Sequence, residues 1–413
     1  MKDSSNAVHT HSAVVLSCKG GDQGDLGLVR SLGREGVPVV FVTENPRAHS
    51  LASKYIDSSI FVNSFKANPR QVIDKLVAYA RDRVHKPVLF PTADPDLELV
   101  SEYRDDLSEH YHFTMPSRKI VETFLDKSRF FGFGQEKFFP LPATFTPSPE
   151  QSIETIAARV DYPAILKPLN PKAWSRGRIQ EMVNSKKALV VDSADELVQR
   201  FNAIAAYDSS MVVQEYIPGR DDRLYSVHIY MGKNGEPLGS FVGRKIRTYP
   251  AYAGIGCFVI SEFNQALVDI SVDILRKSAY LGLALLQFKK DPDSGRFVLL
   301  EINARTSSWN QLALVCGVNL PYMAYLDVLD KPVPTASAQR NDVKYIYFKP
   351  DVIALSEYRK TGDWSFSSWI KSYSGRKTFQ LFCIDDPFPF IKVFGRDLQS
   401  FFGSLLNKLF RFR

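Results

Sequence analysis

Cysteine is scarce in this chain of 413 residues, which contains four: Cys18, Cys257, Cys316 and Cys383. They lie far apart, and no two of them form a Cys-x-x-Cys pair. This argues against a disulfide framework and against a structural zinc site, because both need suitably spaced cysteines. A reducing compartment fits this usage best.

Long apolar runs are also missing. No stretch approaches the roughly 18 residues that a membrane-spanning helix needs. The apolar residues 13–16, which follow a polar start, are too few for the core of a secretory signal. We therefore expect a cytoplasmic protein, with peripheral attachment to the inner face of the membrane as the alternative.

Two familiar catalytic signatures are absent. The glycines at 20, 21, 24 and 27 do not match the Gly-x-Gly-x-x-Gly dinucleotide fingerprint. A simple strand-to-helix turn and a turn that presents backbone N–H groups to a phosphate both stay open there. The seven histidines form no Ser-His-Asp set, and we interpret the pairs His9/His11 and His110/His112 as surface residues.

What is present is an ordinary globular composition with an unusual tail. The chain is 45% hydrophobic and 23% charged, and its length predicts two or three domains. The net charge is +7, from 52 Lys and Arg against 45 Asp and Glu. Residues 331–413 hold 14 Lys and Arg, 7 Asp and Glu and 17 aromatic residues, so the rest of the chain is neutral.

Hydrophobic patterning predicts an α/β protein. Strand patterns at 13–16 and 37–42 enclose a helix pattern, which is the β-loop-α-β unit of a parallel sheet. Further strands at 60–62 and 88–90 complete one small α/β domain over residues 1–118.

A second domain is predicted over residues 119–330, with a lid subdomain at 145–213. Its strands and hairpins are expected at 163–168, 188–191, 211–217, 224–231 with 239–242, and 284–289 with 297–302. An Asn-Gly turn supports the first hairpin. Residues 331–413 follow as a basic, aromatic-rich extension.

Oxygen donors and a cation gather in the second hairpin. Glu301 and Asn303 are two residues apart on a strand and point to one face, and Gln287 lies on the preceding strand. Carboxylate and amide oxygens suit a hard cation such as Mg²⁺. Arg305 follows and could neutralise a transferring phosphoryl group. The alternative, a solvated hairpin face, does not account for this set beside the apolar residues 298–300.

Two weaker motifs precede this hairpin. Lys167 closes an apolar strand, where its ammonium could hold a phosphate as a point charge, although most such lysines are solvated. Residues 214–219 end a strand whose exposed backbone could read an adenine edge, and Asp222 could accept hydrogen bonds from ribose hydroxyls. Each motif alone is more typical of an ordinary strand end.

Taken together, these motifs resemble the ATP-grasp superfamily. Their order is Asp126-Lys127, Ile165-Leu-Lys-Pro168, Gln214-Glu-Tyr-Ile217, Asp222, Gln287 and Glu301-Ile-Asn-Ala-Arg305. The last group looks spaced as in the large chain of carbamoyl phosphate synthetase, and the whole is similar to a carboxylate–amine ligase group that includes D-aspartate ligase. The resemblance covers residues 12–330 and implies a Rossmann-like pre-ATP-grasp domain followed by an ATP-grasp fold.

The resemblance also implies a role for each residue. The ATP phosphates would be bound by Lys127 and Lys167, adenine by Gln214, Glu215, Tyr216 and Ile217, and ribose by Asp222. One or two Mg²⁺ ions, with Mn²⁺ as a substitute, would be held by Gln287, Glu301 and Asn303. The catalytic cations would be Arg305 at the transferred phosphoryl group and Arg244 and Arg247, with Lys245, at an anionic substrate or intermediate. A solvated basic strand is the alternative for the last three.

The activity that the resemblance implies is an ATP-dependent carboxylate–amine ligase. It would join a small-molecule carboxylate to an amine through an acylphosphate, on an amino acid, cell-envelope or glycan substrate, without nucleic acid. The alternatives are an ATP-binding protein without turnover and a peripheral membrane scaffold. One departure is the loop at 170–178, which has one glycine where the family has several, so Lys172, Arg176 or Arg178 would meet phosphate directly. The oligomeric state is not predicted.

The end of the extension, residues 390–413, has the pattern of a basic amphipathic helix. Its apolar face is predicted to hold Phe394, Leu398, Phe401, Phe402, Leu405 and Leu409, with Lys392, Arg396, Lys408 and Arg411 largely off that face. Such a helix could lie at an anionic membrane surface or pack on the body of the protein. No nucleic-acid reader motif accompanies the charge.

Overall fold

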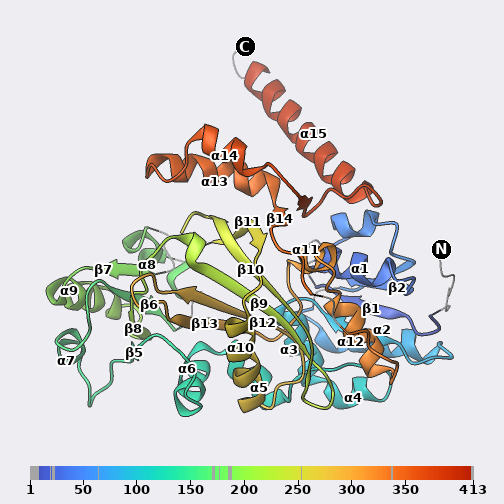
Figure 1. The fold of residues 1–413 in the computed structure, drawn as a ribbon, viewed down its shortest axis with the longest axis horizontal. Helices are drawn as coiled ribbons and strands as arrows, with labels where there is room; N and C mark the ends of the chain where they lie inside the picture. Colours follow the sequence, from blue (N-terminus) through green and yellow to red (C-terminus); the bar gives the residue numbers. More distant parts are fainter. Residues whose placement is uncertain are drawn as a thin grey trace. The chain divides into compact units, whose positions relative to one another are not determined.

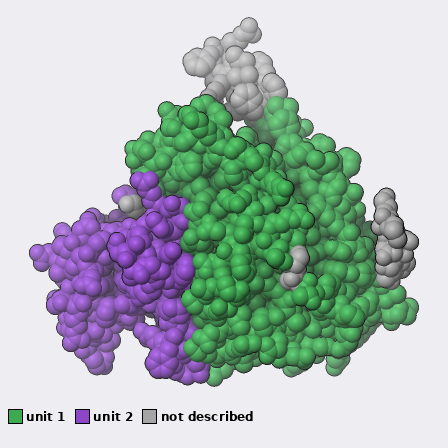
Figure 2. Space-filling model, viewed as in Figure 1, with its two compact units in different colours: residues 1–121, 225–286, 302–413 green, residues 122–224, 287–301 purple. Residues whose placement is uncertain are grey.

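The computed structural model describes residues 9–18, 20, 24–63, 65–169, 173–175, 177–184, 188–252, 254–335 and 338–410, with backbone only for 175 and 401–410. The chain divides into two compact units (Figure 2). Unit 1 comprises residues 1–121, 225–286 and 302–413, and unit 2 comprises residues 122–224 and 287–301. These units cut across the segments 1–118, 119–330 and 331–413, which therefore remain a proposal about the sequence.

The first sheet of unit 1 is four-stranded and wholly parallel, in the order β3-β2-β1-β4 (Figure 1). Its strands are β1 (Ala13–Leu16), β2 (Val39–Thr43), β3 (Ser58–Phe61) and β4 (Val88–Pro91). Both central strands are buried along their length, as expected for a parallel sheet covered on both faces. The predicted parallel sheet is therefore confirmed. Its helical elements are α1 (Asp25–Gly33), η1 (His49–Ala52), α2 (Pro69–Arg81), α3 (Asp94–Glu102) and α4 (Arg104–Ser108).

The turn that leads into α1 is stabilised by buried hydrogen bonds and by close packing of α1 against α11 (Asn310–Val315). The carboxylate of Asp25 is buried and accepts hydrogen bonds from the hydroxyls of Ser17 at 3.0 Å and Ser50 at 2.8 Å. A Cβ at Gly27 would lie 3.1 Å from the backbone nitrogen of Gln311, so glycine lets α1 approach α11 closely. These contacts favour the simple strand-to-helix turn over a phosphate cradle. Gly21 lies outside the described residues.

The sheet of unit 2 has four strands in the order β5-β8-β6-β7, and all its pairings are antiparallel. They are β5 (Thr144–Phe145), β6 (Ala164–Pro168), β7 (Leu189–Val191) and β8 (Met211–Glu215). Its helical elements are α6 (Lys127–Glu136), α7 (Ile153–Ala157), η2 (Ala173–Ser175), α8 (Gly177–Met182), α9 (Ala194–Ala205) and η3 (Asp221–Arg223). The helix α5 (Arg118–Leu125) contributes to both units. Trp174 is buried in the core between this sheet and its helices.

The largest sheet has seven strands in the order β13-β12-β9-β10-β11-β14-β15. They are β9 (Leu224–Met231), β10 (Pro237–Tyr249), β11 (Ile255–Ser261), β12 (Gly282–Lys290), β13 (Phe297–Asn303), β14 (Lys344–Ile346) and β15 (Lys377–Phe379). The antiparallel pairing of β9 with β10 confirms the first predicted hairpin, and β12 and β13 are neighbours as expected for the second. The length of β10 and the addition of β14 and β15 were not predicted.

The C-terminal extension belongs to unit 1. It contributes β14 and β15 to the large sheet, and it adds α13 (Phe348–Lys360), α14 (Phe366–Ser372) and α15 (Phe388–Phe410). The remaining helices of this unit are α10 (Gln265–Lys277) and α12 (Leu320–Val328). Within the part of the chain that the structure describes, no helix is long and apolar enough to span a membrane.

Candidate active site

Lys167 lies at the end of β6 in unit 2, as the sequence pattern predicts. Its ammonium donates a hydrogen bond of 2.7 Å to the side-chain oxygen of Gln214 on the neighbouring strand β8. It also lies 5.0 Å from the centre of the Phe131 ring. The amide of Gln214 is itself buried and donates to the hydroxyl of Thr144 at 2.8 Å. Lys167 is therefore held in place by a buried amide rather than extended into solvent.

The electrostatic surroundings of Lys167 combine burial with a second cation and a carboxylate. Burial and, to a smaller extent, the nearby charge of Lys127 lower the pKa of its ammonium to about 8, while the charge of Glu301 opposes both effects. Two neighbouring cations repel each other and destabilise the folded protein unless an anion lies close to both of them. The pair Lys127 and Lys167 is suited to the phosphates of a nucleotide.

Lys127 is the first residue of α6. Asp126 caps this helix, because its carboxylate accepts a hydrogen bond of 2.9 Å from the backbone N–H of Arg129. The structure ends α5 at Leu125 and starts α6 at Lys127, so Asp126 lies between the two helices. The new helix start adds the positive end of a helix dipole next to Lys127.

The end of β8 carries the predicted adenine-binding residues. The side chain of Glu215 accepts from the backbone N–H of Ala143 at 2.9 Å and from the guanidinium of Arg296. The backbone N–H of Glu215 donates to the carbonyl of Ala143 at 2.8 Å. Ile217 is buried, and Tyr216 is half-buried.

A cation that the sequence analysis missed lies beside this strand end. The ammonium of Lys289 on β12 is 5.6 Å from the centre of the Tyr216 ring. Burial lowers the pKa of Lys289, and the charge of Asp221 opposes that shift. Lys289 is two residues after Gln287 on one strand, so the alternation that placed Gln287 could have found it. The predicted ribose ligand Asp222 is half-buried in η3, beside the buried Asp221.

The predicted metal ligands Gln287 and Glu301 are brought together in unit 2. The side-chain amide of Gln287 on β12 donates a hydrogen bond to the carboxylate of Glu301 on β13. Glu301 is exposed, and its negative charge acts on Lys167. Asn303, the third predicted ligand, is the last residue of β13, two positions further along the strand.

These residues fit Mg²⁺ through the chemistry of their donors. The carboxylate of Glu301 and the amide oxygens of Gln287 and Asn303 are hard oxygen ligands. Within the described residues, no three His, Cys, Asp or Glu side chains gather to hold a metal ion. A sparse protein ligand set of this kind suits Mg²⁺, which takes much of its coordination from nucleotide phosphates and water.

Arg305 lies in unit 1, just after β13. Its guanidinium donates to Asp94 at the start of α3 at 2.6 Å, to the side-chain oxygen of Asn303 at 3.2 Å and to the carbonyl of Thr306 at 3.2 Å. Three acceptors on two sides fix the orientation of the guanidinium. Asp94 was not among the predicted residues, because its partner lies 211 positions away in the sequence.

Arg244 is oriented by an acidic partner in unit 1. Its guanidinium donates to Glu262 at 2.7 Å, and the same carboxylate accepts from the hydroxyl of Tyr225 at 3.1 Å. The Arg244 side chain keeps 25% of its surface exposed. It is therefore held in one orientation and stays accessible to an anion.

Arg247 corrects the expectation that β10 presents two catalytic arginines. Its side chain is fully buried and forms a two-point ion pair with Asp351 of α13, at 2.7 and 2.9 Å. The guanidinium lies between the rings of Phe258 and Trp364, 4.1 and 4.3 Å from their centres. We therefore assign Arg247 a structural role, and its neighbour Lys245 is buried as well.

The loop that departs from the family pattern is only partly described. Lys172 and Arg176 lie outside the described residues. Arg178 is described in α8, where its guanidinium lies 5.8 Å from the centre of the Tyr207 ring. Trp174 is anchored in the core of unit 2.

Comparisons with known proteins find a family and several relatives that are similar to this chain. The family described as "ATP-grasp in the biosynthetic pathway with Ter operon" matches residues 208–349. The D-aspartate ligase of Enterococcus faecium (strain Aus0004) is 26% identical over 259 residues, which is 61% of each chain. The N-terminal section of the carbamoyl phosphate synthase large chain of Methanopyrus kandleri is 22% identical over 287 residues, 69% of this chain and 49% of that one. The chain thus spans only about half to three fifths of these relatives.

Solved structures show the same fold. An ADP complex of N5-carboxyaminoimidazole ribonucleotide synthetase matches with a TM-score of 0.59 and 14% identity, covering 81% of both chains. A biotin carboxylase from Campylobacter jejuni in complex with a β,γ-ATP compound has a TM-score of 0.59 and 17% identity, covering 82% of this chain and 75% of that one. The resemblance to the ATP-grasp superfamily is therefore confirmed, and the chain has an ATP-grasp fold preceded by a small parallel α/β domain.

Proposed function

We propose that this protein is an ATP-dependent carboxylate–amine ligase that acts in the cytoplasm on small-molecule substrates. One observation in unit 2 carries the proposal. Lys167 lies close enough to both Lys127 and Glu301 for their charges to change its pKa, and Glu301 is bonded to Gln287. Two cations for phosphates and oxygen donors for Mg²⁺ are what bound Mg²⁺-ATP requires. One of the similar proteins is named D-aspartate ligase, and a ligase activity is consistent with the reaction proposed here.

The nucleotide would be held by residues of unit 2. Lys127 and Lys167 would bind the α- and β-phosphates. The strand end at Gln214–Ile217 would bind adenine through the Glu215 carbonyl and the Ile217 N–H. Asp222 would bind the ribose. Lys289 adds a further cation beside Tyr216.

Mg²⁺, or Mn²⁺ in its place, would be held by Gln287, Glu301 and Asn303 together with phosphate oxygens. When bound, such an ion neutralises phosphate charge and so favours transfer of the γ-phosphoryl group. Arg305, oriented by Asp94, would stabilise negative charge on that group in the transition state.

The reaction would take place in two steps. A carboxylate oxygen of the acid attacks the γ-phosphorus of ATP, the bond to the β,γ-bridging oxygen breaks, and ADP leaves. The amine then attacks the carbonyl carbon of the acylphosphate, phosphate leaves, and the nitrogen loses a proton to form the amide. Arg244, held by Glu262, would bind the anionic acid or the acylphosphate. Positioning and charge neutralisation supply the catalysis, so no Ser-His-Asp set is needed.

The experiment that tests the proposal measures ADP release with Mg²⁺-ATP across a matrix of acids and amines. Amino acids, uronic acids and small diacids are the first acids to try. ADP formed only in the presence of one acid supports carboxylate activation, and the amine that raises the rate identifies the product. ATP binding that is confirmed by calorimetry, with no ADP from any pair, supports the ATP-binding protein without turnover instead.

Replacement of Glu301 by alanine tests the metal ligand. The expected loss of turnover is at least about a hundredfold, because one charged oxygen ligand is removed. Glu150→Ala is the matched control, since Glu150 is an exposed glutamate of the same unit outside the candidate site. Full activity in the Glu301→Ala variant, measured at several Mg²⁺ concentrations, would contradict the assignment.

A further inference from the structure

Exposed apolar side chains are concentrated in the C-terminal extension. Of the 20 large apolar side chains that are exposed among the described residues, 12 lie between residues 348 and 398. Ile384 is 88% exposed and Phe394 is 57% exposed. A globular protein rarely keeps so many exposed apolar side chains in one region unless the region contacts something. We call this set the C-terminal apolar surface: Phe348, Val352, Ile353, Phe366, Ile370, Phe382, Ile384, Phe388, Phe390, Ile391, Phe394 and Leu398.

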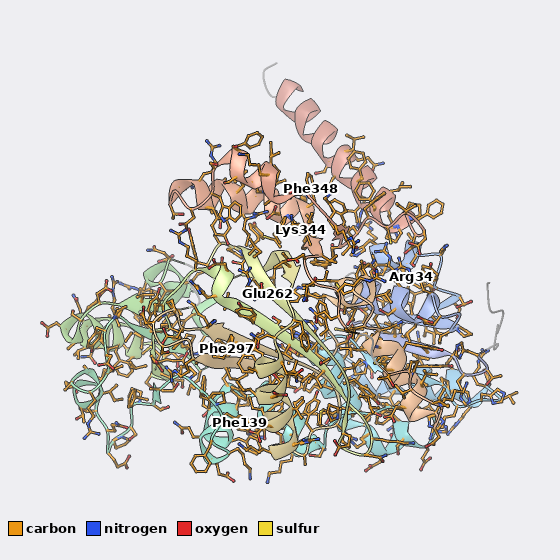
Figure 3. The ribbon with its side chains drawn as sticks, in the orientation of Figure 1. Arg34, Phe139, Glu262, Phe297, Lys344 and Phe348 are labelled. Atoms are coloured by element: carbon orange, nitrogen blue, oxygen red, sulfur yellow. The ribbon has the colours of Figure 1, made fainter. Side chains whose placement is uncertain are left out.

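The residues of this surface are connected through contacts within unit 1. On α15, the rings of Phe390 and Phe394 stack with centres 5.8 Å apart, and Phe390 also contacts Phe382 edge-on at 5.5 Å. The helix α13 is tied to α15 by an ion pair of 2.9 Å between Lys349 and Asp397. Phe348 precedes that lysine and lies where α13 approaches α15 (Figure 3). The ring of Phe348 also contacts that of Tyr373, at the C-terminal end of α14, with centres 6.4 Å apart, so the surface extends over α13, α14 and α15.

Six of the seven acidic groups of the extension accept hydrogen bonds or form ion pairs, and four of the six are paired with an Arg or Lys. Asp351 and Asp386 form buried ion pairs with Arg247 and Arg30, which belong to earlier parts of the chain. The other engaged groups are Asp385 with Arg34, Asp397 with Lys349, Asp363 with the hydroxyl of Tyr252, and Glu357 with the backbone N–H of Ala251. Of the seven acidic residues in the extension, only Asp342 lies outside this set.

Exposed basic side chains accompany the apolar surface. Lys371 follows Ile370 on α14, and Arg396 follows Phe394 on α15 by two positions. Further exposed cations of the extension are Arg359, Lys360, Arg376 and Lys377. Because four of its seven carboxylates are paired with Arg or Lys, this part of unit 1 presents positive charge together with aromatic and aliphatic side chains.

We propose that the C-terminal apolar surface docks this protein on an anionic lipid bilayer. Apolar side chains flanked by Lys and Arg bind such a surface by inserting below the headgroups while the cations attract anionic lipids. A second copy of the chain is a poorer occupant, because the same positive surface would then face itself. The proposal is independent of the ligase reaction and does not involve any candidate active-site residue.

Flotation of the full chain with vesicles tests the proposal. One set of vesicles is phosphatidylcholine alone, and the other is phosphatidylcholine and phosphatidylglycerol in equal parts. We expect binding to the anionic vesicles that is at least about tenfold stronger than to the neutral ones and that weakens as salt is raised. Equal binding to both, or none to either, overturns the proposal.

Two double variants distinguish lipid binding by the C-terminal apolar surface from nonspecific binding by other exposed apolar side chains. Ile384→Ser with Phe394→Ser is expected to lower the partition coefficient by about tenfold or more, because two inserted apolar groups are removed. The matched control is Val84→Ser with Phe138→Ser, which removes two side chains that are 94% and 88% exposed elsewhere. Equal losses in the two double variants would contradict the assignment of the surface.

Charge reversal provides the second pair. Lys360→Glu with Lys371→Glu should abolish the preference for anionic vesicles, whereas Lys66→Glu with Arg81→Glu, which changes the net charge equally, should keep it. Light scattering across protein concentrations is run in parallel. A concentration-dependent dimer that the Ile384→Ser and Phe394→Ser changes disrupt, without vesicle binding by the parent chain, would assign the surface to a second copy and overturn the proposal.

Discussion

At the scale of single residues, Lys167 shows how burial prepares a group for a ligand. The ammonium is held by the Gln214 amide and lies near a second cation, Lys127. Burial and repulsion both favour the neutral amine, so its pKa falls to about 8. Bound phosphate would restore the charged form, because an anion nearby stabilises the ammonium. Affinity for ATP should then depend on pH in a range where ordinary lysines do not titrate.

The direction of that dependence follows from the lowered pKa. Below about pH 8 Lys167 is protonated and attracts phosphate, and above it the charge is lost, so we expect ATP affinity to fall about tenfold between about pH 7 and about pH 9.5. In the nucleotide-free protein the folded state releases this proton before the unfolded state does. The free energy of unfolding should therefore gain from Lys167 as the pH rises from about 8 to the ordinary value of 10.5.

Calorimetric titration with ATP across this pH range measures the effect. Lys167→Arg should give a nearly flat profile, because a guanidinium stays protonated. Lys137→Arg, an exposed lysine of the same unit, is the control and should keep the parent profile. A parent profile without a decline near pH 8 would contradict the role of Lys167.

At the scale of elements, β10 carries arginines with opposite roles. Arg244 is partly exposed and forms an ion pair with Glu262. Arg247 is fully buried, where it pairs with Asp351 of α13 and contacts two aromatic rings. Asp351 also accepts from the indole of Trp369 at 2.8 Å and the hydroxyl of Tyr373 at 2.6 Å. The extension thus stabilises the strand from which Arg244 projects.

Asp351→Ala should lower the free energy of unfolding by about 3 to 5 kcal/mol, because it leaves the Arg247 guanidinium buried without its carboxylate. The double variant Arg247→Met with Asp351→Leu should lose much less, since both charges are replaced by apolar groups. It should also keep turnover, because Arg247 has a structural role.

Urea denaturation of the full chain measures these stabilities. Asp397→Ala, which removes the surface ion pair with Lys349, serves as the comparison and should cost no more than about 1 kcal/mol. If Asp351→Ala cost no more than this, the buried pair would not have the importance assigned to it.

At the scale of the whole molecule, the extension is a structural part of unit 1. It supplies β14 and β15 to the large sheet and Asp351 and Asp386 to the two buried arginines. The guanidinium of Arg30 is fully buried and donates to Asp386 at 2.9 Å and to the carbonyl of Leu381 at 2.8 Å. An end of the chain that looked like an added segment therefore completes the core.

A chain truncated to residues 1–330 should not fold, since Arg30 and Arg247 would be buried without partners and two strands would be missing. A chain of residues 1–400 should fold, because it retains Asp351, Asp386 and the Lys349–Asp397 pair. Soluble yield and size-exclusion chromatography distinguish the outcomes. A monodisperse 1–330 chain with the thermal midpoint of the full chain would show that the extension is dispensable.

The sequence by itself determined the elements whose cause is local. Short continuous apolar runs placed the parallel strands, and the Asn-Gly turn placed the hairpin of β9 and β10. Spacing on neighbouring strands brought Gln287 together with Glu301. The ordered series of weak motifs predicted the ATP-grasp fold, which the comparisons confirm. The role of each site residue stays a prediction.

Only the tertiary structure decided which arginine of β10 is exposed to solvent and which is buried in the core. Arg244 and Arg247 look alike in the sequence, but the partner of Arg247 lies 104 positions away, on a helix that no local pattern connects to β10. Asp94 was missed for a similar reason, because its partner Arg305 lies 211 positions away in the sequence. Burial and ion pairing depend on which segments meet in space, and a single sequence records only the order of the segments.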